Sequence, residues 1–224
     1  MPRSVSGALS ERRSVRAFLD RPVPEGVIET LIASATRAPS GGNLQPWHID
    51  VVMGARLDEL KALMTDRTRD DPRGEPMDYA IYPAGLSSPY EDRRKFIGEA
   101  LYGTLGIPYE DRTSRRAWFT RNFQFFGAPV GIFCHVDRSM GPPQWSDLGM
   151  FLQSLMLLAV EAGLATCAQE CWAMYPRTVG HFLRLREDHI LFCGMALGYE
   201  DSEATVNTLH SPREDITEIL TIHR

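Results

Sequence analysis

Arg12, Ser14 and Arg16 are the first residues along the chain whose types and spacing could bind a ligand. In an extended stretch the three side chains share one face, because side chains alternate along such a backbone. Two guanidinium groups and a hydroxyl on one face suit a phosphomonoester, which they hold through charge-assisted hydrogen bonds. On a helix only the two arginines would stack, and Pro22 and Pro24 favour a chain that has left a helix near Arg12. A solvated arginine surface explains the same residues, so the phosphate site is one of two interpretations.

A second polar segment, residues 39–47, has the sequence PSGGNLQPW and lies between an expected helix and an expected strand. Its two glycines, Gly41 and Gly42, permit positive φ and let a flat ligand approach the backbone closely. Asn43 and Gln45 add amide donors and acceptors. A tight helix-to-strand turn with polar side chains is the alternative interpretation, which this segment taken alone favours.

Other reactive residue types form no recognisable site in the sequence. Cys167 and Cys171 lack further soft or imidazole ligands nearby, so buried thiols are expected there and no metal. No nucleophile elbow or Ser-His-Asp order is visible, so covalent catalysis by the protein is not indicated. The histidines within or beside apolar strands, expected to be structural, are His48, His135 and His189.

The composition is that of a globular protein without a broad basic surface. Of the 224 residues 43% are hydrophobic and 24% are charged, which is enough for one sizeable core. The net charge of -5 disfavours nucleic acid as a partner. Four cysteines without a dense framework, and an amino terminus without a signal-peptide pattern, predict a cytoplasmic protein with reduced thiols. The most apolar segment, residues 148–164, is too short for a membrane span, so we expect a buried helix.

Helical and strand-like patterns alternate along the chain and predict a single domain over residues 1–224. No Gly-x-Gly-x-x-Gly or P-loop pattern opens a helix after a strand, which disfavours a Rossmann domain. Helices are expected over residues 24–39, 57–64, 115–126, 147–163 and 176–185. Strands are expected over residues 47–53, 128–136, 164–171 and 190–197.

Residues 66–93 are polar and rich in proline and charge. The segment is longer than the usual unstructured connection, so it is expected to be functional or partly helical. A substrate lid and a mobile surface insertion explain it equally well.

Five segments, taken together and in this order, resemble the nitroreductase family. They are ERRSVRAF, APSGGNLQPWHI, DLGMFLQSLMLLAVEAGLATCAQE, ILFCGMALGYED and VNTLHSPRED. The resemblance implies an α+β fold with a central mixed, mainly antiparallel sheet surrounded by helices, in an intertwined homodimer. It spans nearly the whole chain but not residues 66–115, which are expected to form a lid or insertion. It also implies that the extension over residues 204–224 wraps around the partner, although the extension could pack on its own subunit.

The resemblance assigns FMN to the subunit interface and implies which residues bind it. The residues near the amino terminus would bind its phosphate and ribityl chain, and Arg213 would close on the phosphate. Residues 39–43 would come from the partner subunit and face the isoalloxazine ring. Gln169 and Glu170 match the region where relatives place backbone N–H groups near flavin N5 and the pyrimidine edge, and Asn122 is a weak candidate for a further polar contact there. The full set is Arg12, Arg13, Ser14, Arg16, Pro39, Ser40, Gly41, Asn43, Gln169, Glu170 and Arg213.

The implied activity is electron transfer from NADPH or NADH to small electrophiles such as nitroaromatics, quinones or enones. The dinucleotide would stack on the flavin, give hydride to N5 and leave before the acceptor enters, which is a ping-pong sequence. The cofactor carries this chemistry, so no catalytic side chain is expected. The alternatives are a reductive dehalogenase or enone reductase on the same fold, a flavin sensor or storage protein, and a flavin-free structural dimer.

Overall fold

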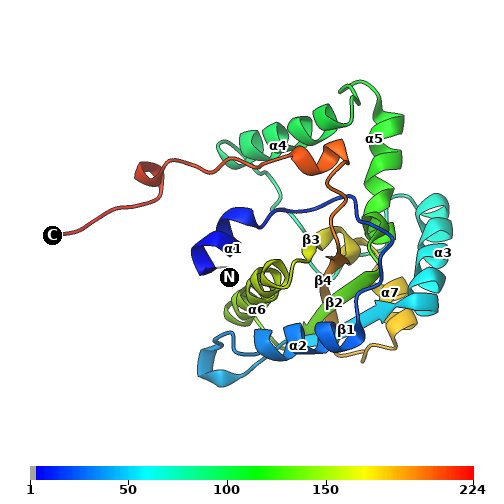
Figure 1. Ribbon diagram of the computed structural model, residues 1–224, viewed down its shortest axis with the longest axis horizontal. Coiled ribbons are helices and arrows are strands. Elements are labelled where there is room, and N and C mark those ends of the chain that lie inside the picture. The colour runs from blue at the N-terminus through cyan, green and yellow to red at the C-terminus, as the bar shows by residue number, and fades with distance from the viewer. Residues whose placement is uncertain (1–3) are drawn as a thin grey trace.

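The computed structural model describes residues 4–224 and has a four-stranded sheet with helices on both faces (Figure 1). The strands are β1 (His48–Met53), β2 (Val130–Asp137), β3 (Ala165–Gln169) and β4 (His189–Gly198), in the order β1-β2-β4-β3. The α-helices are α1 (Val5–Glu11), α2 (Glu25–Ala35), α3 (Gly54–Asp70), α4 (Tyr90–Thr104), α5 (Arg112–Phe119), α6 (Pro142–Glu161) and α7 (Pro176–Leu183). The 3-10 helices are η1 (Gly41–Asn43), η2 (Thr120–Gly127), η3 (Glu170–Met174), η4 (Thr205–Thr208) and η5 (Ile216–Glu218).

The sheet is antiparallel throughout its four strands. The expected α+β class is therefore confirmed, and the expected parallel component is limited, in the described part of the chain, to an isolated bridge between Ser14 and Thr166. This bridge joins the segment after α1 to the edge strand β3.

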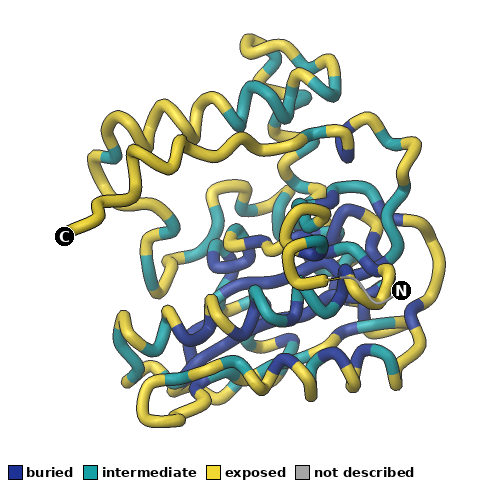
Figure 2. Tube along the Cα trace, turned by 60° about the vertical axis from the view of Figure 1, so that its left-hand side comes forward, coloured by how far each residue is buried: buried dark blue, intermediate teal, exposed yellow. Residues whose placement is uncertain are grey.

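Each face of the sheet buries its own core, because successive residues of a strand point to opposite faces. Ile132 of β2 packs in one core with side chains of α2 and α6, among them Phe151. The next residue, Phe133, packs in the other core with side chains of α3, η2, η3 and α7, among them Leu60 and Trp172. Figure 2 shows the buried residues gathered on the sheet and on the inner sides of these helices.

Every expected helix and strand has a counterpart, and two boundaries need physical explanation. Helix α6 begins at Pro142, five residues before the expected start, because proline is tolerated in the first helical turn. The helix expected over residues 115–126 is instead α5 followed by η2, in which Phe125 and Phe126 have φ of 49° and 54°. These left-handed conformations end the helical turns of η2, and the burial of both rings offsets their cost.

The polar segment expected over residues 66–93 is shorter in the structure. Helix α3 continues to Asp70 and α4 begins at Tyr90, so residues 71–89 are the non-helical part. Helices α4 and α5 contain no buried residue and lie to one side of the sheet (Figures 1 and 2). Beyond η4 the chain runs beside α4, where Arg93 and Glu214 form an ion pair of 2.5 Å, and then leaves the body of the molecule.

Residues 4–224 contain no helix that combines the length and apolar character needed to cross a membrane. The same residues contain no group of three or more His, Cys, Asp or Glu side chains arranged to hold a metal ion.

Three histidines and an aspartate form a network across β1, β2 and β4. His135 contacts Asp50 through Nε2, at 2.8 Å, and His189 through the two Nδ1 atoms, at 2.7 Å. The ring of His48 stacks on that of His135, with centroids 5.4 Å apart. Because a neutral Nδ1 pair needs one donor and one acceptor, the network requires His135 and His189 not to be protonated together.

The protein is expected to lose stability as the pH falls below about 6.5. Burial, and then the charge of His135, lower the pKa of both His48 and His189, although Asp50, Asp137 and Asp188 oppose the shifts and Arg186 adds to them. A histidine whose folded-state pKa lies below its unfolded value of 6.5 binds protons more tightly when unfolded. Its contribution is complete above that pH and is lost as the pH falls toward the folded-state pKa. Urea unfolding at several pH values checks this.

The control for this pH dependence is a histidine outside the network. His48→Gln should flatten the dependence, and His210→Gln, in the exposed tail, should leave it unchanged. Equal slopes in the wild type and His48→Gln would contradict the assignment of the effect to this network.

Candidate functional site

The segment that carries Arg12, Ser14 and Arg16 is extended, as the sequence analysis expected. Helix α1 ends at Glu11, and the backbone then joins β3 through the N–H of Val15, which donates to the Thr166 carbonyl at 3.0 Å. The buried Asn207 of η4 fixes the next residue, because its Oδ1 accepts from the Arg16 N–H at 2.7 Å. The three side chains therefore start from a backbone that is held at two successive points.

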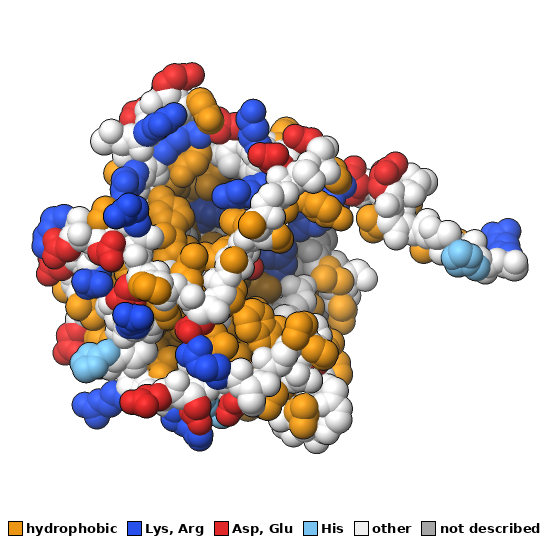
Figure 3. Space-filling view, turned by 180° about the vertical axis from the view of Figure 1, so that it is seen from behind, with side chains coloured by type: hydrophobic (Ala, Val, Ile, Leu, Met, Phe, Trp, Pro, Cys, Tyr) orange, Lys and Arg blue, Asp and Glu red, His pale blue; other side chains and the backbone are white. Residues whose placement is uncertain are grey.

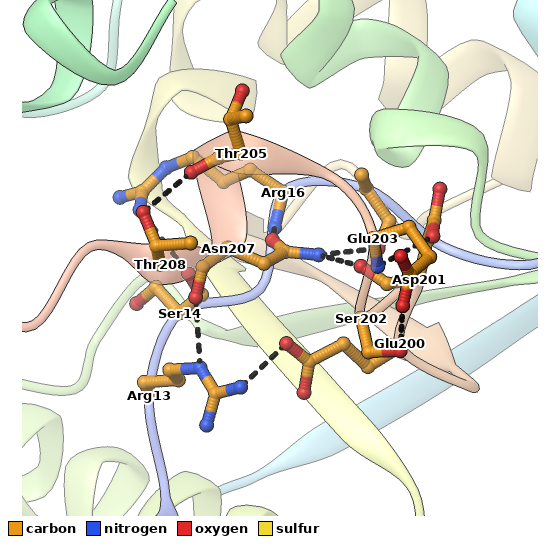
Figure 4. A network of polar contacts seen from close by, with 11 residues as sticks. Arg13, Ser14, Arg16, Glu200, Asp201, Ser202, Glu203, Thr205, Asn207 and Thr208 are labelled. Atoms are coloured by element: carbon orange, nitrogen blue, oxygen red, sulfur yellow. Dashed lines mark hydrogen bonds and ion pairs between the residues drawn. The ribbon is translucent and has the colours of Figure 1, made fainter.

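The three arginines of this segment differ in their partners (Figure 4). Arg13 forms an ion pair of 2.5 Å with Glu200 and donates to the Asn207 carbonyl. Arg16 donates to the Ser14 carbonyl at 3.2 Å, and within residues 4–224 neither it nor Arg12 has a carboxylate partner. The charge of Arg13 is thus neutralised within the fold, whereas those of Arg12 and Arg16 are available to a ligand.

Ser14 bridges to Thr166, the neighbour of Cys167 in β3. Burial raises the pKa of the Cys167 thiol, and Arg16, the Ser14 hydroxyl and Arg12 each act in the opposite direction. The backbone bridge therefore places the segment beside this part of the edge strand. Two cations without a carboxylate partner in residues 4–224, together with a hydroxyl, are a donor set that suits a compact anion.

The loop over residues 39–45 is an exposed turn, and its shape is set by Asp147 of α6. The buried Asp147 carboxylate accepts from the Gly41 N–H at 3.2 Å, and the Ser40 hydroxyl accepts from the Gln45 N–H at 3.0 Å. Gly42, Asn43 and Gln45 have positive φ of 59°, 56° and 49°. Strain at non-glycine residues is retained where the surroundings fix it and is often associated with binding. Within residues 4–224 no hydrogen bond or ion pair joins this loop to Arg12–Arg16.

Gln169 and Glu170, at the end of β3, have different surroundings. Gln169 is 3% exposed, and its amide nitrogen donates to the carbonyl and the side-chain oxygen of Asn122 at 2.7 and 3.2 Å. Asn122, the weak candidate of the sequence analysis, thus lies beside Gln169. Glu170 is at the surface of the same region, and burial raises the pKa of its carboxyl group.

A cavity of about 620 Å³ opens beside Asn122, Gln169 and Glu170. Its other walls come from residues 73–82, from Arg94 of α4 and from Phe119 of α5. Figure 3 shows a hollow in this side of the molecule, with hydrophobic side chains on its wall and basic side chains around it. The cavity is large enough for an aromatic molecule beside the end of β3.

Arg213 is not joined to the Arg12, Ser14 and Arg16 group by any hydrogen bond in the described chain. Its guanidinium group donates to the Ser211 hydroxyl and to the carbonyls of Ser211 and Pro212. It lines a second hollow, of about 800 Å³, between the tail and α4.

Four side chains that support the candidate site were not singled out in the sequence. They are Glu75, Asp147, Glu200 and Asn207. Glu200 and Asn207 contact Arg13 from positions 187 and 194 residues further along the chain, Asp147 contacts Gly41 at a separation of 106 residues, and Glu75 contacts α7 at a separation of 102 residues. No local pattern could have identified these contacts.

Residues 71–89 are fixed at two points beside the cavity. The carboxylate of Glu75, whose side chain is 8% exposed, accepts from the Arg177 and Thr178 N–H groups, the Thr178 hydroxyl and Arg67. Although burial opposes the shift, these hydrogen bonds hold the pKa of Glu75 below its ordinary value. The Tyr79 hydroxyl donates to the Phe192 carbonyl of β4. The part of the segment between these contacts is held against η3, α7 and the sheet.

Glu75→Gln is expected to lower the free energy of unfolding by about 2 kcal/mol, because a neutral amide accepts more weakly from Arg67 and the start of α7. Chemical denaturation checks the loss, and hydrogen exchange should show faster opening of residues 71–79. Glu59→Gln is the control, since that carboxylate pairs with Arg56 in solvent and contributes about 0.5 kcal/mol or less. Equal effects of both substitutions would contradict the anchoring role of Glu75.

Known proteins resemble this chain over most of its length. The model of the nitroreductase family matches residues 9–199. A 4-nitrobenzoate reductase of Pseudomonas putida is 40% identical over 92% of this chain and 89% of its own length. A nitrobenzene nitroreductase of Ectopseudomonas oleovorans is 34% identical over 99% of this chain and 98% of its own length.

A solved structure extends the agreement to three dimensions. NfnB of sphigopyxis sp. strain HMH, an FMN and NADPH-dependent nitroreductase, has a TM-score of 0.96, 50% identity and coverage of 99% of both chains. The match of the family model, the near-complete coverage of these relatives and the shared fold lead to one conclusion: this chain belongs to the nitroreductase family.

Proposed function

We propose that this chain is an FMN-dependent oxidoreductase that passes electrons from NADPH or NADH to nitroaromatic or related electrophilic acceptors. The observation that supports the proposal is that Arg12 and Arg16, on either side of Ser14, have no carboxylate partner within residues 4–224. A flavin mononucleotide ends in a phosphomonoester, and this donor set fits that group. The relatives named above are a 4-nitrobenzoate reductase and two nitroreductases, and this favours nitroreduction over dehalogenation, enone reduction and flavin storage.

The roles of the individual residues follow from their surroundings. Arg12, Ser14 and Arg16 bind the phosphate end, while Arg13 holds this segment on Glu200 and leaves its backbone to contribute at the same end. Gln169, fixed by Asn122, and Glu170 border the space where the ring would lie. The bound flavin supplies hydride acceptance and donation, and the chain supplies position and a partly enclosed cavity.

The exposed loop and the tail support a homodimer with FMN at its interface. Pro39, Ser40, Gly41 and Asn43 lie in an outward-facing turn that makes no polar contact with the phosphate-binding group of its own described chain, which fits a role in the partner's site. Tail residues Ile216, Ile219, Leu220 and Ile222 are 53 to 71% exposed and need a surface to cover them. Arg213, in the same tail, is free to turn toward a phosphate when the tail is docked.

Residues 66–115 are proposed to cover the substrate cavity as part of the single domain 1–224. Because Glu75 and Tyr79 fix the start of residues 71–89, closure would involve residues 80–115. The four free cysteines support a cytoplasmic location, where thiols stay reduced. Neither nucleic acid nor a membrane is part of the proposed function.

An anaerobic absorbance spectrum tests the function. Oxidised flavin bands should bleach on addition of NADPH or NADH and return with a nitroaromatic acceptor. A flavin spectrum that ignores both nucleotides would favour a sensor or storage protein. Failure to bind added FMN would refute the proposal.

Deletion of residues 212–224 is expected to weaken the dimer and lower the amount of bound flavin, because it removes the apolar side chains that are proposed to pack on the partner. Size-exclusion chromatography with light scattering measures the first effect, and the flavin-to-protein ratio measures the second. If the shortened chain stays dimeric with its full flavin content, the tail packs on its own subunit.

A further inference from the structure

Arg73 lies where two cavities meet. The cavity of about 620 Å³ beside Gln169 and a smaller one of about 270 Å³ share the lining residues Arg73, Phe119 and Met174. A molecule that occupies the larger cavity and extends away from the end of β3 therefore passes Arg73. This residue is neither in the segment that binds phosphate nor in the loop assigned to the partner's site.

The backbone of Arg73 is fixed by its neighbours, whereas its guanidinium group has no partner in the described part of the chain. The Glu75 N–H donates to the Met174 carbonyl at 2.7 Å, and the positive φ of Gly74 brings its Cα against the same carbonyl. Of the other arginines nearby, Arg67 pairs with Glu75 and Arg115 with Glu99, while Arg116 donates to the Pro72 carbonyl at 2.9 Å. Within residues 4–224 Arg73 makes neither an ion pair nor a side-chain hydrogen bond.

A second arginine strengthens the positive charge of the larger cavity. Arg94 of α4 lies over the ring of Tyr82, 4.1 Å from its centroid, which leaves its N–H edge open. Glu170 is the only acidic residue among the described residues that line the two cavities. Within residues 4–224 neither Arg73 nor Arg94 forms an ion pair with Glu170, and burial raises the pKa of its carboxyl group. The cavity thus offers two guanidinium groups to an occupant and no carboxylate that neutralises them.

We propose that Arg73, with Arg94, binds an anionic oxyacid group on the molecule that occupies this cavity. The inference rests on the proposed function, since that molecule is either the acceptor or the dinucleotide. A carboxylate on a nitroaromatic acceptor and the 2′-phosphate that distinguishes NADPH from NADH share the required chemistry. In both cases the aromatic part lies at the Gln169 end and the anion lies at the junction of the two cavities.

The test compares wild-type holoenzyme with Arg73→Gln in separate half-reactions. One arm measures kcat/KM for 4-nitrobenzoate and for uncharged nitrobenzene, and the other measures flavin reduction by NADPH and by NADH. Loss of a charge-assisted hydrogen bond should lower the rate constant for the ligand that carries the anion about tenfold or more relative to its neutral or unphosphorylated counterpart. Selective loss with 4-nitrobenzoate identifies the acceptor as the ligand, and selective loss with NADPH identifies the dinucleotide.

A binding measurement supports the kinetic arms without turnover. Benzoate and 2′-phosphoadenosine are titrated separately against the oxidised protein, and the change in flavin absorbance gives each Kd. The Kd of the anion that the kinetic arms identify should rise about tenfold in Arg73→Gln. It should recover in part in Arg73→Lys, which restores the charge but not the bidentate geometry of a guanidinium group. Arg184→Gln, at an exposed arginine that lines neither cavity, should change nothing.

Two outcomes separate failure of this inference from failure of the proposed function. Suppose that both proteins turn over, and that the 4-nitrobenzoate-to-nitrobenzene ratio, the NADPH-to-NADH ratio and both Kd values are the same in the wild type and in Arg73→Gln. Arg73 is then not an anion receptor, and the proposed function stands. If the wild type neither binds FMN nor reduces any acceptor, the proposed function is wrong and this inference with it.

Discussion

Arg16→Gln is expected to bind FMN about 10 to 100 times more weakly than the wild type, because a charge-assisted hydrogen bond to phosphate contributes about 1.5 to 3 kcal/mol. Arg16 has no carboxylate partner in the described chain, so its charge is not needed to balance the fold. Asn207 holds the Arg16 backbone through its N–H, and that contact survives the substitution. Fluorescence titration of the apoprotein with FMN gives the dissociation constant, and thermal unfolding without FMN should be almost unchanged.

Arg13→Gln is the matched control for this experiment. Arg13 carries the same charge three residues earlier, but it pairs with Glu200, and the two side chains are 30% and 23% exposed. A pair this accessible to solvent contributes about 1 kcal/mol or less to stability. Arg13→Gln should therefore lower the unfolding temperature slightly and leave FMN affinity within about threefold. Equal losses of affinity in both variants would mean that the segment acts through its fold, not through the free charge of Arg16.

Gly194→Ala is expected to destabilise the protein by about 3 kcal/mol, at the upper end of the usual cost of overpacking a core. A β-carbon at Gly194 would overlap with the indole ring of Trp172, which is completely buried between Phe125 and Phe133. The ring cannot move away without disturbing these neighbours, because protein cores are close-packed. Urea unfolding measures the loss.

Gly194→Ala should also disturb the candidate site. Gly194 pairs with Gln169 across β4 and β3, and the Trp172 indole N–H donates to the Gln169 side chain at 3.4 Å. Displacement of Trp172 would therefore release Gln169 from its position beside Asn122, and flavin content should fall. Gly180→Ala in α7 is the control, since its β-carbon would meet no atom within 4 Å, and alanine should stabilise the helix by about 0.5 to 1 kcal/mol. A stable Gly194→Ala variant would show that this core can adjust.

The helices and strands could be predicted from local sequence, because the apolar periodicity that indicates each of them lies within a few residues. The apolar spacing after Pro24 gives α2, and the nearly continuous apolar run of β2 reflects burial on both faces of the sheet. The extended segment after α1 follows from the proline punctuation, so the shared orientation of Arg12 and Arg16 could be predicted. What the sequence could not show is which arginine of RRSVR is neutralised, since Glu200 and Asn207 come from the other end of the chain.

The amino-acid sequence alone predicts the α+β class, the family resemblance and the residue types of the candidate site. Long-range contacts made all the named strands antiparallel, replaced the end of the expected helix by η2 with its left-handed residues Phe125 and Phe126, and fixed the start of residues 71–89 through Glu75 and Tyr79. The tertiary structure also places Arg73 at the junction of two cavities, with no ion-pair partner among residues 4–224. The physical reason is the same in each case: helical and strand periodicity is local, whereas charge pairing, cavity shape and backbone strain depend on contacts between residues far apart in the chain.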